Sequence, residues 1–181
     1  MSEYKQMQKK SPTGIAATPF AGRLNIWQAC IFGPDETLWE GGTFFLRYVS
    51  SFISDISHNT KLFLSPKYRQ TKTSTSNNRI EFTSEYPNKP PIFKFQTKMF
   101  HPNIYKDGKI CLDILQNKWS PGFNISAVLT SIQSLLPDPN PDSPANPEAS
   151  NMFTDDSEGY AERVRACVEE SWVYNETFEK Y

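Results

Sequence analysis

The chain has 181 residues, of which 38% are hydrophobic and 22% charged, and its formal net charge is -1. These values indicate a single globular domain, and no apolar run reaches the roughly 18 residues of a membrane span. The acidic C-terminal third argues against direct nucleic-acid binding. Three cysteines (Cys30, Cys111, Cys167) and two histidines (His58, His101) are too few and scattered for a disulfide framework or zinc cluster, so we expect no metal site and a reducing compartment.

The first half of the chain reads as a short helix followed by strands. Residues 2–10 suit a helix that ends before a Ser-Pro pair. In the next run Trp27, Ala29 and Ile31 occupy every second position, which indicates a strand, and a Gly-Pro pair closes it. The predicted strands cover residues 22–34, 41–49 and 90–99.

The second half reads as helices. Residues 124–136 carry an apolar stripe at helical spacing, which predicts a buried helix. Asn146 is a plausible cap with proline at the first helical position, and a last helix follows from residue 159. The two stripes are Ile125, Val128, Leu129, Ile132 and Leu136, and then Tyr160, Val164, Cys167, Val168 and Trp172. This order predicts an α+β fold with a four-stranded antiparallel meander flanked by helices.

Residues 48–79 do not fit this plan, although the chain otherwise reads as one domain over 1–181. The segment is rich in Ser, Thr and Asn, and its second half has almost no apolar residues. If it is removed, Phe44, Leu46, Ile80 and Phe82 share one face of a continuous strand. We therefore predict an insert that interrupts a strand. A translated intron is one explanation, because codons for residues 47–49 can contain GTATGT, and a flexible basic loop is the other.

The motif HPNIYKDGKICLDILQNKWSP spans residues 101–121. It resembles the active-site segment of the ubiquitin-conjugating enzymes, and the resemblance covers nearly everything outside residues 48–79. Stretches such as YPNKPP, DILQNKW and VLTSIQSLL are most similar to the branch acting in post-replication DNA repair and histone ubiquitylation. Outside such a motif, a single cysteine in an apolar run is usually a core residue, which is our interpretation of Cys30 and Cys167.

The resemblance implies a transferase in which Cys111 carries ubiquitin as a thioester. The thiolate is the attacking form. Asn103 would stabilise the oxyanion with its amide or, alternatively, hold the loop, whereas His101 and Pro102 would shape the turn. A Cys-His hydrolase is disfavoured because no third orienting group is evident.

The acceptor lysine is expected to approach residues 138–144. Asp142 or Ser143 would lie near its amine, and phosphorylation of the Ser143-Pro144 site could supply negative charge there. No phosphate-binding glycine loop occurs, so ATP is used upstream and no cofactor is expected.

The expected partners are ubiquitin, the activating enzyme, a RING-type ligase and protein substrates such as a histone or the replication clamp. The acidic last third would suit a basic protein partner, although a solvated helix surface is the preferred explanation. The branch suggests the cytoplasm and nucleus. The residues expected to contact ligases are Pro87, Asn88, Lys89, Trp119, Ser120 and Pro121.

Three alternatives stay open at this point. The chain could be a non-catalytic scaffold, could carry another ubiquitin-like modifier, or could be poorly folded because of the insert. The first helix also begins roughly two turns later than in the family, with only three lysines, so charging and ligase docking are open questions at this point.

Overall fold

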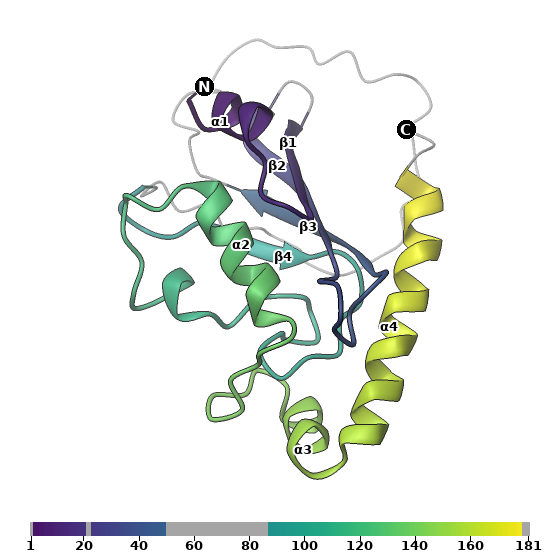
Figure 1. The fold of residues 1–181 in the computed structure, drawn as a ribbon. Coiled ribbons are helices and arrows are strands. Elements are labelled where there is room, and N and C mark those ends of the chain that lie inside the picture. The colour runs from purple at the N-terminus through teal and green to yellow at the C-terminus, as the bar shows by residue number, and fades with distance from the viewer. Residues whose placement is uncertain (1, 21–22, 50–86, 179–181) are drawn as a thin grey trace, which may run out of the picture.

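The computed structural model describes residues 2–20, 23–49 and 87–178. Its centre is a four-stranded antiparallel sheet in the order β1 (Ile15–Phe20), β2 (Arg23–Phe32), β3 (Thr43–Val49) and β4 (Ile92–Phe95). Each strand pairs with the next one along the chain, so the sheet is a meander, as predicted. Figure 1 shows α1 (Ser2–Lys9) beside β1 and α2 (Ile125–Leu135) across one face of the sheet.

One face of the sheet forms the core. On β2 the side chains of Trp27, Ala29 and Ile31 are buried, which confirms the predicted alternation. On β3 and β4 the residues Phe44, Leu46, Phe93 and Phe95 are likewise buried. Ala29 pairs with Leu46, and Leu46 pairs with Phe95, so neighbouring strands present these side chains to the same side.

Helix α2 covers this core face with the stripe that the spacing predicted. The side chains of Ile125, Val128, Leu129, Ile132 and Leu135 are buried, and Leu136 follows the helix. Burying one such side chain contributes roughly 2 kcal/mol of transfer free energy. The Asn124 side chain accepts from the Ala127 N–H and caps the helix start. The stripe therefore fixes the position of α2 on the sheet.

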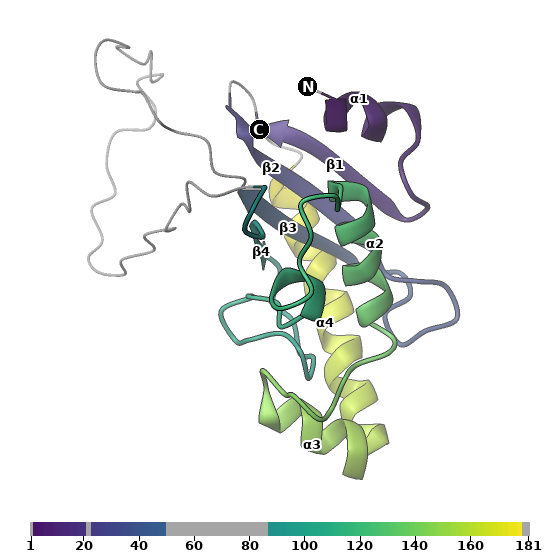
Figure 2. The same cartoon turned by 90° about the vertical axis from the view of Figure 1, so that its left-hand side faces the viewer.

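Two further helices complete the fold at the end of the sheet opposite α1. Helix α3 (Pro147–Asp155) begins with Asn146 as its cap and proline at its first turn, as predicted. Helix α4 (Ser157–Phe178) follows directly and contacts β3, and Figure 2 shows α3 and α4 from the side. The Ser171 hydroxyl accepts from the Thr43 N–H at 3.0 Å, which fastens α4 to the start of β3.

Three sequence interpretations need correction. The first strand, β1, was not located, because Ile15–Phe20 is rich in small residues and contains Pro19. Proline is tolerated there because β1 is an edge strand and its register shifts at Pro19/Phe20. Trp172 is 52% exposed and not part of the buried face, since its indole N–H donates to the Gly41 carbonyl at 2.8 Å. Cys30 is half-buried on the face of the sheet opposite the core.

Most of the predicted insert at residues 48–79 lies outside the described residues, as do Ile80 and Phe82. Tyr48 and Val49 are the exception, because β3 runs through them and pairs with β2 and β4. The strand therefore extends two residues into the predicted insert. Among the helices of the described ranges, none has the length and apolar character needed to cross a bilayer.

Candidate active site

Cys111 lies at the end of a tight hairpin. The two arms meet at a bridge between Ile104 and Ile110, whose side chains are buried. The Cys111 N–H donates to the Asn103 carbonyl at 2.9 Å. At the turn, Gly108 has φ of 89° and its missing Cβ leaves room for the Phe95 carbonyl. The turn of the hairpin is joined to β4, because the Phe95 N–H donates to the Gly108 carbonyl at 2.9 Å, and the side chain of Cys111 at the hairpin end is half-exposed.

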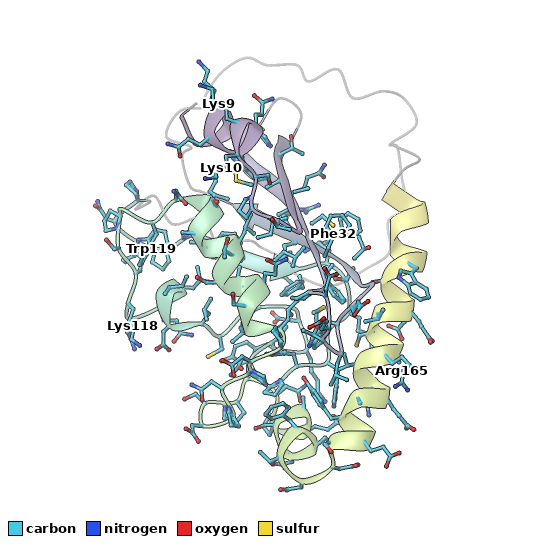
Figure 3. The ribbon with its side chains drawn as sticks, in the orientation of Figure 1. Lys9, Lys10, Phe32, Lys118, Trp119 and Arg165 are labelled. Atoms are coloured by element: carbon cyan, nitrogen blue, oxygen red, sulfur yellow. The ribbon has the colours of Figure 1, made fainter. Side chains whose placement is uncertain are left out.

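A short 3-10 helix, Asp113–Leu115, follows Cys111 and turns the chain back toward it. The carbonyl of Asp113 accepts from the N–H groups of Gln116 and Lys118, both at 3.0 Å, and its carboxylate pairs with the Lys118 ammonium at 2.7 Å. This turn brings the Gln116 amide nitrogen to 3.4 Å from the Cys111 sulfur. Figure 3 shows Lys118 on this segment. Gln116 was not among the predicted site residues, and its position depends on the turn rather than on local sequence spacing.

The Asn103 side chain ties the hairpin to the loop that precedes α3. Its amide nitrogen donates to the Asn140 carbonyl at 2.6 Å and more weakly to the Ser143 carbonyl at 3.4 Å. Its oxygen accepts from the Asn140 N–H at 2.8 Å. The side chain is 2% exposed. In this structure the amide of Asn103 is therefore engaged by the loop, which is the geometry of the holding role and not of a free oxyanion donor.

His101 is fully buried, and both nitrogens of its ring form hydrogen bonds. Its Nδ1 accepts from the Asn103 N–H at 2.9 Å, so Nε2 carries the proton and donates to the Leu135 carbonyl at 2.9 Å. Burial lowers the pKa of His101 to about 4, so the ring is neutral at physiological pH. The adjacent Pro102 carbonyl accepts from the N–H groups of Ala145 and Asn146. These contacts position the site but leave no nitrogen of the ring for proton transfer.

Asp142 and Ser143 stand on the loop that Asn103 holds. Both residues are exposed. The Asp142 N–H donates to the Asn140 side-chain oxygen at 3.0 Å, which closes a turn within the loop. Because Asn103 also pairs with Cys111, one residue connects the expected acceptor loop to the cysteine. Asn140, which makes this connection, was missed by the sequence analysis.

The two loops expected to contact ligases lie together. The indole N–H of Trp119 donates to the Pro87 carbonyl at 2.8 Å, and the Trp119 ring packs edge-on against Phe123. Figure 3 shows Trp119 on the loop that leads to α2. Beside these contacts the loops present exposed residues, namely Pro87, Asn88, Lys89, Ser120 and Pro121.

The other two cysteines are poor nucleophiles. Burial raises the pKa of Cys30 to about 11 and also raises the pKa of Cys167, so both thiols stay protonated at neutral pH. Cys167 is 5% exposed within the core, which confirms its predicted place on the buried face of the last helix. Of the three cysteines, Cys111 alone stands in a hairpin with a side-chain amide beside its sulfur.

Comparison with known proteins agrees with this geometry. The family model described as "Ubiquitin-conjugating enzyme" matches residues 1–51 and 67–168. The chain is 46% identical to "Ubiquitin-conjugating enzyme E2 3" of Arabidopsis thaliana, over 96% of this chain and 94% of the relative. It is 43% identical to "Ubiquitin-conjugating enzyme E2 1" of Caenorhabditis elegans, over 96% of this chain and 73% of the relative. The chain belongs to the ubiquitin-conjugating enzymes, transferases that work with ubiquitin, an activating enzyme and ligases.

Proposed function

We propose that Cys111 is the residue that carries ubiquitin. Its thiolate attacks the ubiquitin carbonyl held as a thioester on the activating enzyme, so that a new C–S bond forms and the thiolate of the activating enzyme leaves. In the second step a lysine amine attacks the same carbonyl, the C–N bond forms, Cys111 leaves as thiolate and the amine loses a proton. The observation that carries this assignment is the hydrogen bond from Gln116 to the half-exposed sulfur of Cys111.

The rest of the site would support these two steps. The Asn103 contacts hold the loop of Asp142 and Ser143 at a constant position relative to the cysteine. The incoming amine would meet that loop, where Asp142 attracts the ammonium form before the proton is lost. Phosphorylation of Ser143 would strengthen this attraction, and an unchanged lysine discharge by Ser143→Asp would count against that role.

The experiment that tests the assignment is a charging assay. The chain is mixed with activating enzyme, ATP and ubiquitin and is run on a gel with and without reductant. We expect a reductant-sensitive adduct that Cys111→Ala abolishes. Absence of an adduct with ubiquitin, but presence with another ubiquitin-like modifier, would redirect the function to that modifier. No adduct with any modifier would favour a scaffold.

The same assay addresses residues 48–79. We propose that this segment is an insert within the single conjugating domain, and the family match is interrupted within it, between residues 51 and 67. A chain lacking the segment is charged in parallel. Equal charging of both chains would make the insert a tolerated loop, whereas charging of the shortened chain alone would favour a translated intron. Sequencing of the mature transcript separates the two origins directly.

We further propose that the chain acts in the repair and histone branch of the family, in the nucleus and cytoplasm. The support is the resemblance of the stretches DILQNKW, YPNKPP and VLTSIQSLL to the sequences of that branch. The substrates would then be a histone or the replication clamp, presented by a RING-type ligase that contacts the exposed loops around Pro87 and Trp119. Transfer to nucleosomes or to the clamp with the matching ligase tests the branch. Transfer to neither, by a chain that charges normally, would refute it.

A further inference from the structure

Three Ser-Pro pairs fall within the described residues, and a serine followed by proline is the pattern that proline-directed kinases modify. The hydroxyl of Ser11 donates to the Ile15 carbonyl, so it is held in the turn before β1. Ser143 stands on the acceptor loop and already has a proposed role. Ser120 remains, and it lies in the WSPGF stretch, which is one of the two loops expected to contact ligases.

The side chain of Ser120 is accessible and only weakly engaged. Ser120, Pro121 and Gly122 are all exposed. The Ser120 hydroxyl accepts a long hydrogen bond of 3.4 Å from the Gly122 N–H, and within residues 2–20, 23–49 and 87–178 no group accepts a hydrogen bond from it. The fold therefore does not need the proton of this hydroxyl, in contrast to the proton of the Ser11 hydroxyl.

The backbone at Ser120 suits an enzyme that binds an extended segment. A residue that precedes proline is biased toward extended backbone angles. The Ser120 carbonyl accepts from the Phe123 N–H at 3.0 Å, which closes a turn with Pro121 and Gly122 at its two central positions. Helix α2 has its own cap at Asn124. Opening the turn therefore breaks one backbone hydrogen bond and leaves the start of α2 intact.

The two loops expected to contact ligases carry almost no charge. Residues 87–92 and 119–124 contain one cation, Lys89, and no acid. The indole N–H of Trp119 donates to the Pro87 carbonyl at 2.8 Å, so the loops form one surface, and Figure 3 shows Trp119 on it. A phosphate carries a charge of about -1.5 to -2. Phosphorylation of Ser120 thus changes the net charge of this surface from positive to negative.

A negative charge at this position opposes docking. The cores of protein interfaces are depleted of charged residues, because a charge that is buried without a partner loses its water. Lys118 lies two residues before Ser120, but its ammonium is paired with the Asp113 carboxylate at 2.7 Å. A ligase that covers the loop must therefore remove water from the phosphate, and the surface beneath it offers little compensation.

We propose that Ser120 is a phosphorylation site for a proline-directed kinase, and that its phosphate prevents ligase docking without acting on the thioester chemistry. The Ser120 oxygen attacks the γ-phosphorus of a nucleoside triphosphate bound to the kinase. The new O–P bond forms as the bond from that phosphorus to the β,γ-bridging oxygen breaks, the nucleoside diphosphate leaves, and the hydroxyl proton passes to a carboxylate of the kinase. The inference rests on the proposed role of this loop in ligase docking.

The first experiment tests whether the site is modified. The full chain is incubated with a cyclin-dependent kinase and ATP, and the modified peptides are identified by mass spectrometry. Phosphate is expected on Ser120, and Pro121→Ala should abolish it. Ser11 is the internal control, because its hydroxyl is engaged, and it should stay unmodified. Absence of phosphate from Ser120 would overturn the assignment.

The second experiment tests the effect on ligase action. Ser120 is replaced by phosphoserine during synthesis, and the chain is charged with ubiquitin. Discharge to free lysine is measured with and without a RING domain that accelerates the unmodified chain. The ratio of the two rates isolates docking, because each protein serves as its own reference. Phosphoserine at position 120 is expected to lower this ratio about tenfold or more, whereas Ser120→Ala should lower it much less.

Phosphoserine at position 157 is the matched control. Ser157 is exposed at the start of α4 and lies outside both loops, so the same added charge should leave the ratio unchanged. An unchanged ratio with phosphoserine at position 120, or an equal fall with phosphoserine at position 157, would overturn the inference.

Failure of the underlying proposals would look different. An unmodified chain that forms no thioester would overturn the proposed role of Cys111. A chain that charges normally but is accelerated by no RING domain would overturn the proposed ligase contacts of the loop, and with them this inference.

Discussion

Replacing Asn103 by alanine separates its two possible roles. The side chain makes two short hydrogen bonds with Asn140, at 2.6 and 2.8 Å, and a longer one with the Ser143 carbonyl at 3.4 Å. Each such bond contributes about 1 kcal/mol net to the free energy of unfolding. In the alanine variant part of this loss is offset, because Asn140 is exposed and its backbone groups can bind water instead. We therefore expect Asn103→Ala to lower the free energy of unfolding by about 2 kcal/mol.

This loss is measurable by thermal unfolding without any substrate. For a chain of this length 1 kcal/mol corresponds to about 2–4 °C in Tm, so Asn103→Ala should unfold about 4–8 °C lower. Discharge to lysine should fall as well, because the acceptor loop is released. Asn117→Ala, at an exposed asparagine on the other side of Cys111, should change neither quantity. A variant with normal Tm but abolished discharge would refute the holding role and restore the oxyanion role.

Three further perturbations test other parts of the structure. Tyr160→Phe should raise the free energy of unfolding by about 1 kcal/mol, because the buried Tyr160 hydroxyl has no hydrogen-bond partner among the described residues. Denaturant titration measures this change, and a loss of stability would show that the hydroxyl does have a partner. His101 has a folded pKa of about 4, below its unfolded value, so it contributes stability above pH 6.5 that is lost as the pH falls toward 4, by roughly 3 kcal/mol. His101→Gln should flatten the plot of Tm against pH in that window, and an unchanged slope would contradict this assignment. Gln116→Ala should slow alkylation of Cys111 by iodoacetamide about two- to fivefold, because the amide that donates a hydrogen bond to the sulfur and orients it is removed, and an unchanged rate would argue against a role for this contact.

Much of the architecture could be predicted because periodicity reports burial directly. The two-residue alternation of β2 and β4 and the stripe of α2 each have one consistent face, and the structure buries those faces. Strand β1 has small side chains and a proline, so its only strong signal is its pairing with β2, which depends on residues elsewhere in the chain. Trp172 follows the helical spacing, yet its position is determined by the Gly41 carbonyl, which is 131 residues away.

The residues of the candidate site also fall into those that a local motif indicates and those that only tertiary contacts bring together. Cys111 and Asn103 could be proposed as site residues because they stand in one continuous motif with a characteristic amino-acid sequence. Asn140 could not, because its pairing with Asn103 joins residues 37 positions apart. Gln116 lies within the motif but acquires its contact only through the 3-10 turn. Local patterns thus indicate the candidate nucleophile, whereas the groups that position its side chain arise from tertiary contacts.

The central claim is that ubiquitin is carried on the sulfur of Cys111, and the most direct measurement is to locate the bond. The charged chain is digested under non-reducing conditions and the modified peptide is identified by mass spectrometry, beside a Cys111→Ser variant and a variant with Cys30 and Cys167 both changed to serine. The account predicts a reductant-labile adduct on the peptide containing Cys111, an adduct resistant to reductant on Cys111→Ser, and normal charging of the double variant. An adduct on Cys30 or Cys167, or a labile adduct that survives in Cys111→Ser, would contradict it.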